Sequence, residues 1–114
     1  MAKFHEDLKS KMDAYVHSVY RISKKFPKEE LYGSTSQLRR AALSVILNYI
    51  EGYARIRNKV QKNFIEISYG SLQESKYLLN FSFKENYFSQ EEYNDIMKLA
   101  EDICAMLWGI IRKL

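Results

Sequence analysis

The sequence predicts an all-α fold, an antiparallel up-down-up-down four-helix bundle that occupies residues 1–114 as one domain. Apolar residues recur in steps of three and four along the last quarter of the chain, which is the heptad pattern of a helix packed against other helices. These residues are Tyr93, Ile96, Ala100, Ile103, Leu107, Ile110 and Leu114. One proline and four glycines leave few places for turns, so we expect few and long helices. Because one apolar stripe needs partner helices to bury it, the pattern indicates a bundle.

Turn and capping signals divide the chain into predicted helices over residues 4–26, 34–57, 59–83 and 89–113. Pro27 ends the first helix, because the residue before a proline avoids the α region. Ser34 and Asn58 are each followed three residues later by a glutamine, as in a capping box. Ser89 followed by Glu92 is the clearest capping box in the sequence. Short turns between such long helices make sequential neighbours antiparallel.

The predicted second helix carries two apolar stripes. The first is the expected core stripe, made of Leu38, Ala42, Val45, Tyr49 and Tyr53. The second lies roughly 120° away around the helix. It consists of Leu43, Ile46, Leu47 and Ile50. A single bundle needs only the first stripe, so we interpret the second as an oligomer interface. The alternative is a wider core face, partly covered by the ends of neighbouring helices.

A narrow polar line follows the far side of the same helix, through Arg40, Ser44, Asn48, Glu51 and Arg55. Opposite charges at helical spacing can satisfy each other, so we interpret Arg40, Asn48, Glu51 and Arg55 as a structural polar network. The alternative is contact with a ligand or a nucleic acid. Gly52 beside this line is costly in a helix interior, which indicates a close approach of two backbones.

The residues show no chemistry of a catalytic or metal centre. The two histidines both lie in the predicted first helix, and neither follows a glutamate by three as in di-iron bundles. Cys104 is the single cysteine and is expected to be a small buried hydrophobe. The serines of the third helix, Ser68, Ser71, Ser75 and Ser82, are expected to serve packing. We expect no enzyme activity, catalytic residue, metal or cofactor; a buried polar site along the polar line is the remaining enzymatic alternative.

Charge is unevenly distributed along the chain. Residues 1–62 have a net charge of +7 and residues 63–114 a net charge of −3, for a total of +4. Such a division favours a polyanionic partner or complementary contacts between subunits. No segment reaches the roughly 20 apolar residues that span a bilayer, and the N-terminus lacks the apolar region of a signal peptide. With a single cysteine, we expect a cytoplasmic protein with no membrane role.

Basic residues gather near both ends of the predicted second helix. The candidate nucleic-acid-binding residues are Arg39, Arg40, Arg55, Arg57, Lys59 and Lys62. The helix dipole accounts for cations at a helix C-terminus, such as Arg55 and Arg57, but not for Arg39 and Arg40 near a helix start. Phosphate binding is the functional alternative, with Tyr32 and Tyr53 in reach of bases for stacking.

Several segments resemble the four-helix-bundle proteins encoded in intervening sequences of bacterial 23S ribosomal RNA genes. They are residues 26–33 (FPKEELYG), 35–42 (TSQLRRAA), 51–53 (EGY) and 70–72 (GSL), with Asn48 and Glu74. That family is similar in fold to the accessory variability determinant proteins of diversity-generating retroelements. The resemblance implies a ring-like homopentamer that binds RNA or DNA and associates with a reverse transcriptase. It also implies that Arg39, Arg40, Asn48, Glu51 and Gly52 are motif positions serving fold and assembly.

One departure from the family bears on the second stripe. The family commonly has a proline and a small polar residue where this chain has Ile46 and Leu47. The second helix is therefore expected to be straighter and its surface more apolar, which favours a protein–protein contact there. The leading hypothesis is an oligomeric nucleic-acid-binding accessory factor. The alternative is a protein-interaction scaffold, for a partner such as a reverse transcriptase, without a nucleic-acid role of its own.

Overall fold

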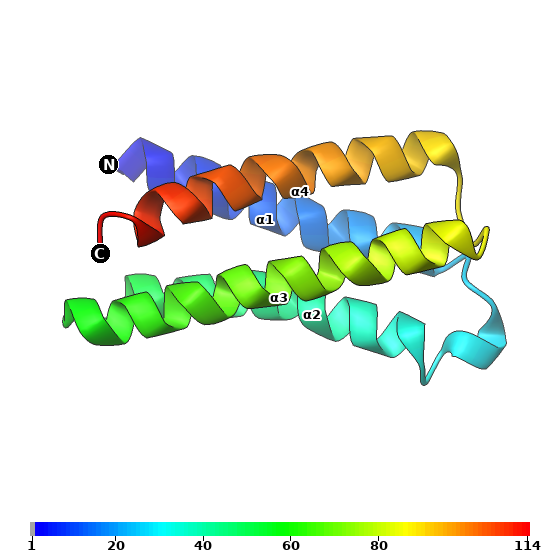
Figure 1. The fold of residues 1–114 in the computed structure, drawn as a ribbon, viewed down its shortest axis with the longest axis horizontal. Helices are drawn as coiled ribbons and strands as arrows, with labels where there is room; N and C mark the ends of the chain where they lie inside the picture. Colours follow the sequence, from blue (N-terminus) through cyan, green and yellow to red (C-terminus); the bar gives the residue numbers. More distant parts are fainter. Residues whose placement is uncertain (1) are drawn as a thin grey trace.

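The computed structural model describes residues 2–114, which form four α-helices and one short 3₁₀ helix. The elements are α1 (Ala2–Ser23), η1 (Lys28–Glu30), α2 (Ser34–Tyr53), α3 (Asn58–Lys84) and α4 (Gln90–Ile111). Successive helices run antiparallel, so both termini and the α2–α3 turn lie at the same end of the molecule (Figure 1). The prediction of an all-α four-helix fold is confirmed.

Three helices end earlier than their sequence pattern predicts. The first ends at Ser23 instead of residue 26, the second at Tyr53 instead of residue 57 and the fourth at Ile111 instead of residue 113. At the first two of these ends the backbone tightens to three-residue hydrogen bonds: Lys25 N donates to Ile22 O at 3.1 Å, and Arg55 N donates to Gly52 O at 3.1 Å. Apolar spacing continues through such turns, so periodicity alone overestimates the length of the helix.

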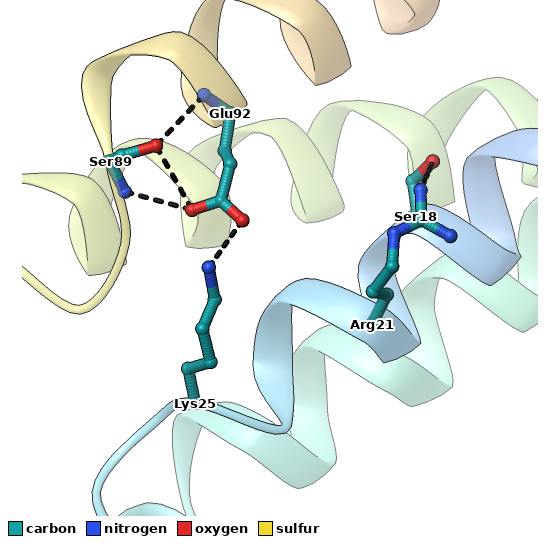
Figure 2. Close-up of polar contacts among 5 residues, drawn as sticks. All are labelled: Ser18, Arg21, Lys25, Ser89 and Glu92. Carbon is teal, nitrogen blue, oxygen red and sulfur yellow. Dashed lines mark hydrogen bonds and ion pairs between the residues drawn. The ribbon is translucent and has the colours of Figure 1, made fainter.

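The predicted capping box at the start of α4 is confirmed. Ser89 Oγ accepts a hydrogen bond from Glu92 N at 3.1 Å, and Glu92 Oε1 accepts one from Ser89 N at 3.1 Å. The other carboxylate oxygen of Glu92 pairs with Lys25 of the turn after α1, so one side chain serves both a helix cap and a tertiary ion pair (Figure 2). On the neighbouring face of α1, Arg21 Nη2 donates to Ser18 Oγ at 3.2 Å.

The two other predicted capping boxes are wrong. The N-cap residues of α2 and α3 are Gly33 and Arg57, and neither makes a side-chain cap hydrogen bond. Ser34 instead donates its backbone N–H (3.2 Å) and its hydroxyl (2.6 Å) to Glu30 Oε1. A carboxylate from η1 thus takes the place of the predicted cap, because the 3₁₀ turn brings Glu30 over the start of α2.

The core follows the predicted stripes closely in the middle of the helices and less closely at their ends. On α2, Leu38, Ala42, Val45 and Tyr49 are buried, whereas Tyr53 at the helix end is 51% exposed. On α4, the buried residues are Ile96, Ala100, Ile103, Leu107 and Ile111. The hydrophobic core is completed by α1, by α3 and by Phe88 of the turn before α4.

The α2 and α3 helices pack closely because small residues line their contact. Ser68 of α3 is fully buried and donates its hydroxyl to Val45 O of α2 at 2.6 Å. Ser44 Oγ and Ser71 Oγ form a second cross-helix hydrogen bond at 2.7 Å. Gly52 is buried in the same contact. Hydroxyl groups and a missing side chain therefore let the two backbones approach.

The close approach at Gly52 leaves no room for a side chain. A Cβ there would lie 3.0 Å from Ile65 Cδ1, 3.1 Å from Phe64 Cβ and 3.2 Å from Gln61 O. The last two atoms belong to the rigid part of α3, so relief requires a shift of one helix against the other. A Cβ at Gly70, also within α3, would meet nothing within 4 Å.

We therefore predict opposite effects for two glycine-to-alanine substitutions. Gly52→Ala should lower the free energy of unfolding by about 1–3 kcal/mol, because overpacking outweighs helix propensity. Gly70→Ala should raise it by up to about 1 kcal/mol, because alanine favours a helix and finds open space. Chemical denaturation of both variants checks this. A stabilised Gly52→Ala protein would show that the helices separate at little cost.

Candidate nucleic-acid interface

The six predicted basic residues divide between two ends of the bundle. Arg39 and Arg40 lie in the first turns of α2, near η1, whereas the others surround the turn between α2 and α3. From Arg40 to the end of α2 at Tyr53 the helix rises about 20 Å, at 1.5 Å per residue. Figure 1 shows the α2–α3 turn and the start of α2 at opposite ends of the molecule. On one chain, therefore, the predicted residues form two separate groups.

The two arginines at the start of α2 have different surroundings. Arg39 is half-buried, and its Nε donates to Ser23 Oγ at 2.7 Å. Its guanidinium carbon lies 4.8 Å from the centre of the Tyr20 ring. These contacts attach α2 to α1, so Arg39 has a structural role. Arg40 is exposed, and its side chain makes no hydrogen bond or ion pair with the described residues 2–114.

The second group forms a compact basic turn between α2 and α3, which we call the basic turn and define as Arg55, Arg57, Lys59 and Lys62. Arg55 pairs with Glu51 and lies 5.1 Å from the centre of the Phe64 ring. Arg57 and Lys59 are exposed and form no ion pair within the part of the chain that the structure describes. Lys62 is half-buried at the start of the second turn of α3.

The basic turn also presents an apolar residue that sequence reasoning missed. Ile56 is 96% exposed, between Arg55 and Arg57. The helical pattern placed it inside the second helix, whereas the helix ends at Tyr53 and leaves it on the turn. The sequence did contain a signal for this exposed residue. Ile56 lies between two arginines, and two polar residues that can begin a helix, Asn58 and Gln61, follow it.

The polar line of α2 does not form one network. Asn48 Nδ2 donates to Ser44 O at 2.9 Å and to Ser44 Oγ at 2.8 Å, and Ser44 links onward to α3. Glu51 and Arg55 form a separate ion pair on the surface. Arg40 takes part in neither contact within the described chain. Because Arg40, Glu51 and Arg55 are all exposed, this line is a surface feature and not a buried pocket.

The second apolar stripe lies mostly on the surface. Leu43, Leu47 and Ile50 are exposed, with Leu47 at 58%. Ile46 is half-buried and packs against the core, so it contributes to both the bundle and the stripe. These three exposed aliphatic side chains are neighbours on one helix, so they form an apolar patch.

The described residues offer no metal centre. Among residues 2–114, no three His, Cys, Asp or Glu side chains are grouped so that they could hold a metal ion. Over the same range, every helix is too short or too polar to cross a bilayer.

Comparison with known proteins places the chain in a family. The sequence model of the 23S rRNA-intervening sequence proteins matches residues 6–109. The chain belongs to this family. No curated protein matches it. The intervening-sequence protein also resembles a solved structure, a protein of unknown function from the S23 ribosomal protein family of Bacteroides thetaiotaomicron VPI-5482. The TM-score is 0.84 at 20% identity, over 91% of this chain and 97% of that chain, so the likeness is one of fold.

One cation in the turn after α1 is engaged in the fold. Lys25 pairs with Glu92, and this contact, together with the backbone N–H of Ser89, lowers the pKa of the Glu92 carboxyl below its ordinary value (Figure 2). The carboxylate is stabilised only in the folded protein. Its contribution to stability is therefore present above a pH of about 4.5, the ordinary pKa, and is lost as the pH falls through the lowered value.

We predict that Lys25→Met lowers the free energy of unfolding at pH 7 by up to about 1 kcal/mol, as expected for a partly exposed ion pair. Lys24→Met is the matched control, because Lys24 is exposed and forms no ion pair in the described chain. The difference between the two variants should shrink as the pH falls below 4.5. Denaturant titrations at several pH values measure it; a difference that persists in acid would contradict the role of Glu92.

Proposed function

We propose that this protein is a non-enzymatic, oligomeric nucleic-acid-binding accessory factor that acts on RNA or DNA in the cytoplasm. It would be of the rRNA intervening-sequence and retroelement-accessory type. The observation that carries the proposal is the basic turn. Two of its exposed cations have no ion-pair partner in the described chain: Arg57, on the short connection between α2 and α3, and Lys59, at the start of α3. Neighbouring cations suit contact with consecutive phosphates, and the release of counterions supplies the free energy.

The surroundings of the candidate cations rank their contributions. Arg39 is occupied by α1 and Arg55 by Glu51, so both would have to give up existing contacts to meet a phosphate. Arg57, Lys59 and Arg40 have no such competitor within the described residues. We infer that the basic turn is the main phosphate contact and that Arg40, at the other end, contacts a more distant part of a long ligand.

Assembly would strengthen this interface. We infer a ring-like homopentamer in which the exposed stripe of α2 contacts the neighbouring subunit. In a ring whose axis runs along the bundles, every subunit presents its basic turn at the same rim. A polyanion that follows the rim would meet several turns at once, which raises its affinity through multivalency.

The alternative function is a protein-interaction scaffold, which binds a partner such as a reverse transcriptase. Exposed aromatic side chains favour it, since Tyr77 on α3 and Trp108 on α4 are 66% and 50% exposed. Aromatic residues are enriched at the centres of protein–protein interfaces. In this case the positive charge would serve solubility and the matching of subunits.

We predict that Arg57→Gln with Lys59→Gln weakens binding to a structured RNA and to duplex DNA by at least about tenfold near physiological salt. The slope of log K against log salt should decrease by about 2 on duplex DNA, because each lost phosphate contact contributes about 0.9. A control with the same change in net charge is Lys84→Gln with Lys98→Gln, far from the turn, which should reduce the slope little. If both double variants lose the same affinity, binding depends on net charge and not on the basic turn. Wild-type binding that vanishes just above low salt would favour the scaffold.

We predict that Leu43→Asp with Leu47→Asp converts the assembly to monomers. Two carboxylates in a contact made of aliphatic side chains would be desolvated without partners. Ile67→Asp on α3 is the control, because Ile67 is similarly exposed but lies outside the stripe. Sedimentation equilibrium measures the mass, and circular dichroism shows whether the helices persist. An unchanged mass in the double variant would remove the stripe from the interface.

A further inference from the structure

A cavity of about 410 Å³ is lined by residues near the two termini and near the α2–α3 turn. Figure 1 shows both termini and this turn at the same end of the bundle. All four helices contribute to its wall, among them His5 of α1, Tyr53 of α2, Gln61 of α3 and Gly109 of α4. Its volume lies in the range of sites for small molecules, and its wall is mainly apolar. It lies next to the basic turn, because Gln61 in its wall donates its Nε2 to Arg55 O at 3.4 Å.

The aromatic part of the wall is ordered by specific contacts. The His5 ring stacks on the Tyr53 ring with centres 3.5 Å apart and planes 10° apart. Its Nδ1 lies 2.8 Å from the Tyr49 hydroxyl, which fixes the ring in the plane of the stack. Phe4 also lines the cavity, and its side chain is 40% exposed. Tyr53 is about half-exposed. His5 covers one face of the Tyr53 ring, and the exposed surface that remains on Tyr53 and Phe4 can contact a further planar ring.

The space persists because Gly109 supplies no side chain to fill it. A Cβ at Gly109 would meet nothing within 4 Å, although the residue lies on a helix that is otherwise well packed. Glycine is unfavourable in the last turns of a helix unless close packing requires it, and here no neighbour approaches. The glycine thus keeps a gap open where a larger residue would close the end of the core.

The polar groups that line the cavity suit a negatively charged ligand with hydrogen-bonding groups on a ring. Arg112 and Lys113 line it, and neither forms an ion pair with the described residues 2–114. No side-chain carboxylate is among the residues that line it. Gln61 contributes a carboxamide, whose Nε2 donates to Arg55 O at 3.4 Å and whose second N–H and oxygen can meet the edge of a base. Aromatic faces, a carboxamide and two cations together match the base and phosphate of a nucleotide.

We propose that this cavity receives one unpaired nucleotide of a single strand that the basic turn holds. The base stacks on Phe4 and the open face of Tyr53, its edge meets Gln61, and its phosphate meets Arg112 and Lys113. This inference rests on the proposed function and adds to it a preference for single-stranded or extruded nucleotides over a regular duplex. The duplex phosphates meet only the basic turn, whereas a single strand meets the turn and the cavity.

The test compares Gly109→Leu with Gly70→Leu in the full chain. Both replace a helical glycine whose Cβ has open space, but only the first fills the cavity. The probes are free AMP, a single-stranded oligonucleotide of ten residues and a blunt DNA duplex. Gly109→Leu should weaken the single strand by about tenfold and abolish the AMP-induced NMR shifts of the His5 ring. Duplex binding should stay unchanged, and Gly70→Leu should match the wild type for all three probes.

The outcomes separate this inference from the proposed function. The Arg57 and Lys59 double variant should weaken duplex and single strand alike. If wild type binds AMP in the cavity but no duplex at any salt, the cavity stands and the role of the basic turn falls. If single strand and duplex bind equally and Gly109→Leu changes neither, the cavity inference is overturned. Arg112→Gln with Lys113→Gln, on exposed positions, repeats the test without touching the core: unchanged AMP affinity there would also overturn it.

Discussion

The close contact between α2 and α3 is the constraint on which the rest of this bundle depends. It is built from hydroxyls and a glycine, and Ser68 even gives its hydrogen bond to the backbone of the neighbouring helix, at Val45 O. Two helices held so near each other can be joined by a turn of only four residues, 54–57. The same closeness turns larger side chains, such as those of Leu43 and Leu47, away from the contact and onto the surface. The small residues at this contact therefore determine where both the basic turn and the apolar stripe lie.

The sequence predicted the helices well because a long apolar stripe with a period near 3.6 has few alternative folds. Its weakest point was the helix ends. Ser34 and Asn58 had the spacing of capping residues, yet a carboxylate from outside α2 and a plain backbone turn took their places. Capping is decided by competition among nearby polar groups, and η1, which brings Glu30 into that competition, leaves no periodic trace. Where the cap used only its own helix, at Ser89, the prediction held.

For the candidate site, too, the sequence predicted some features and missed those that depend on tertiary contacts. Charge composition located the basic residues, but it could not tell a cation that packs on an aromatic ring, such as Arg39, from one that is open to solvent, such as Arg57. That distinction depends on contacts between helices far apart in sequence. The cavity at the end of the bundle was out of reach for a related reason. Its wall combines residues from all four helices, and its existence depends on what Gly109 lacks.

The hydrogen-bonded serines of α3 also affect the axial register of α1 against α3. Tyr15 of α1 is fully buried, and its hydroxyl lies 2.7 Å from Ser75 Oγ, while Ser75 also donates to Leu72 O at 2.8 Å. A slide of α1 by one helical turn would move the phenol by about 5.4 Å and bury its hydroxyl against apolar side chains. An unpaired buried hydroxyl costs about 1–3 kcal/mol, whereas the apolar stripes alone would tolerate the slide. The pair of hydroxyls therefore selects one register among several that the hydrophobic core by itself would accept.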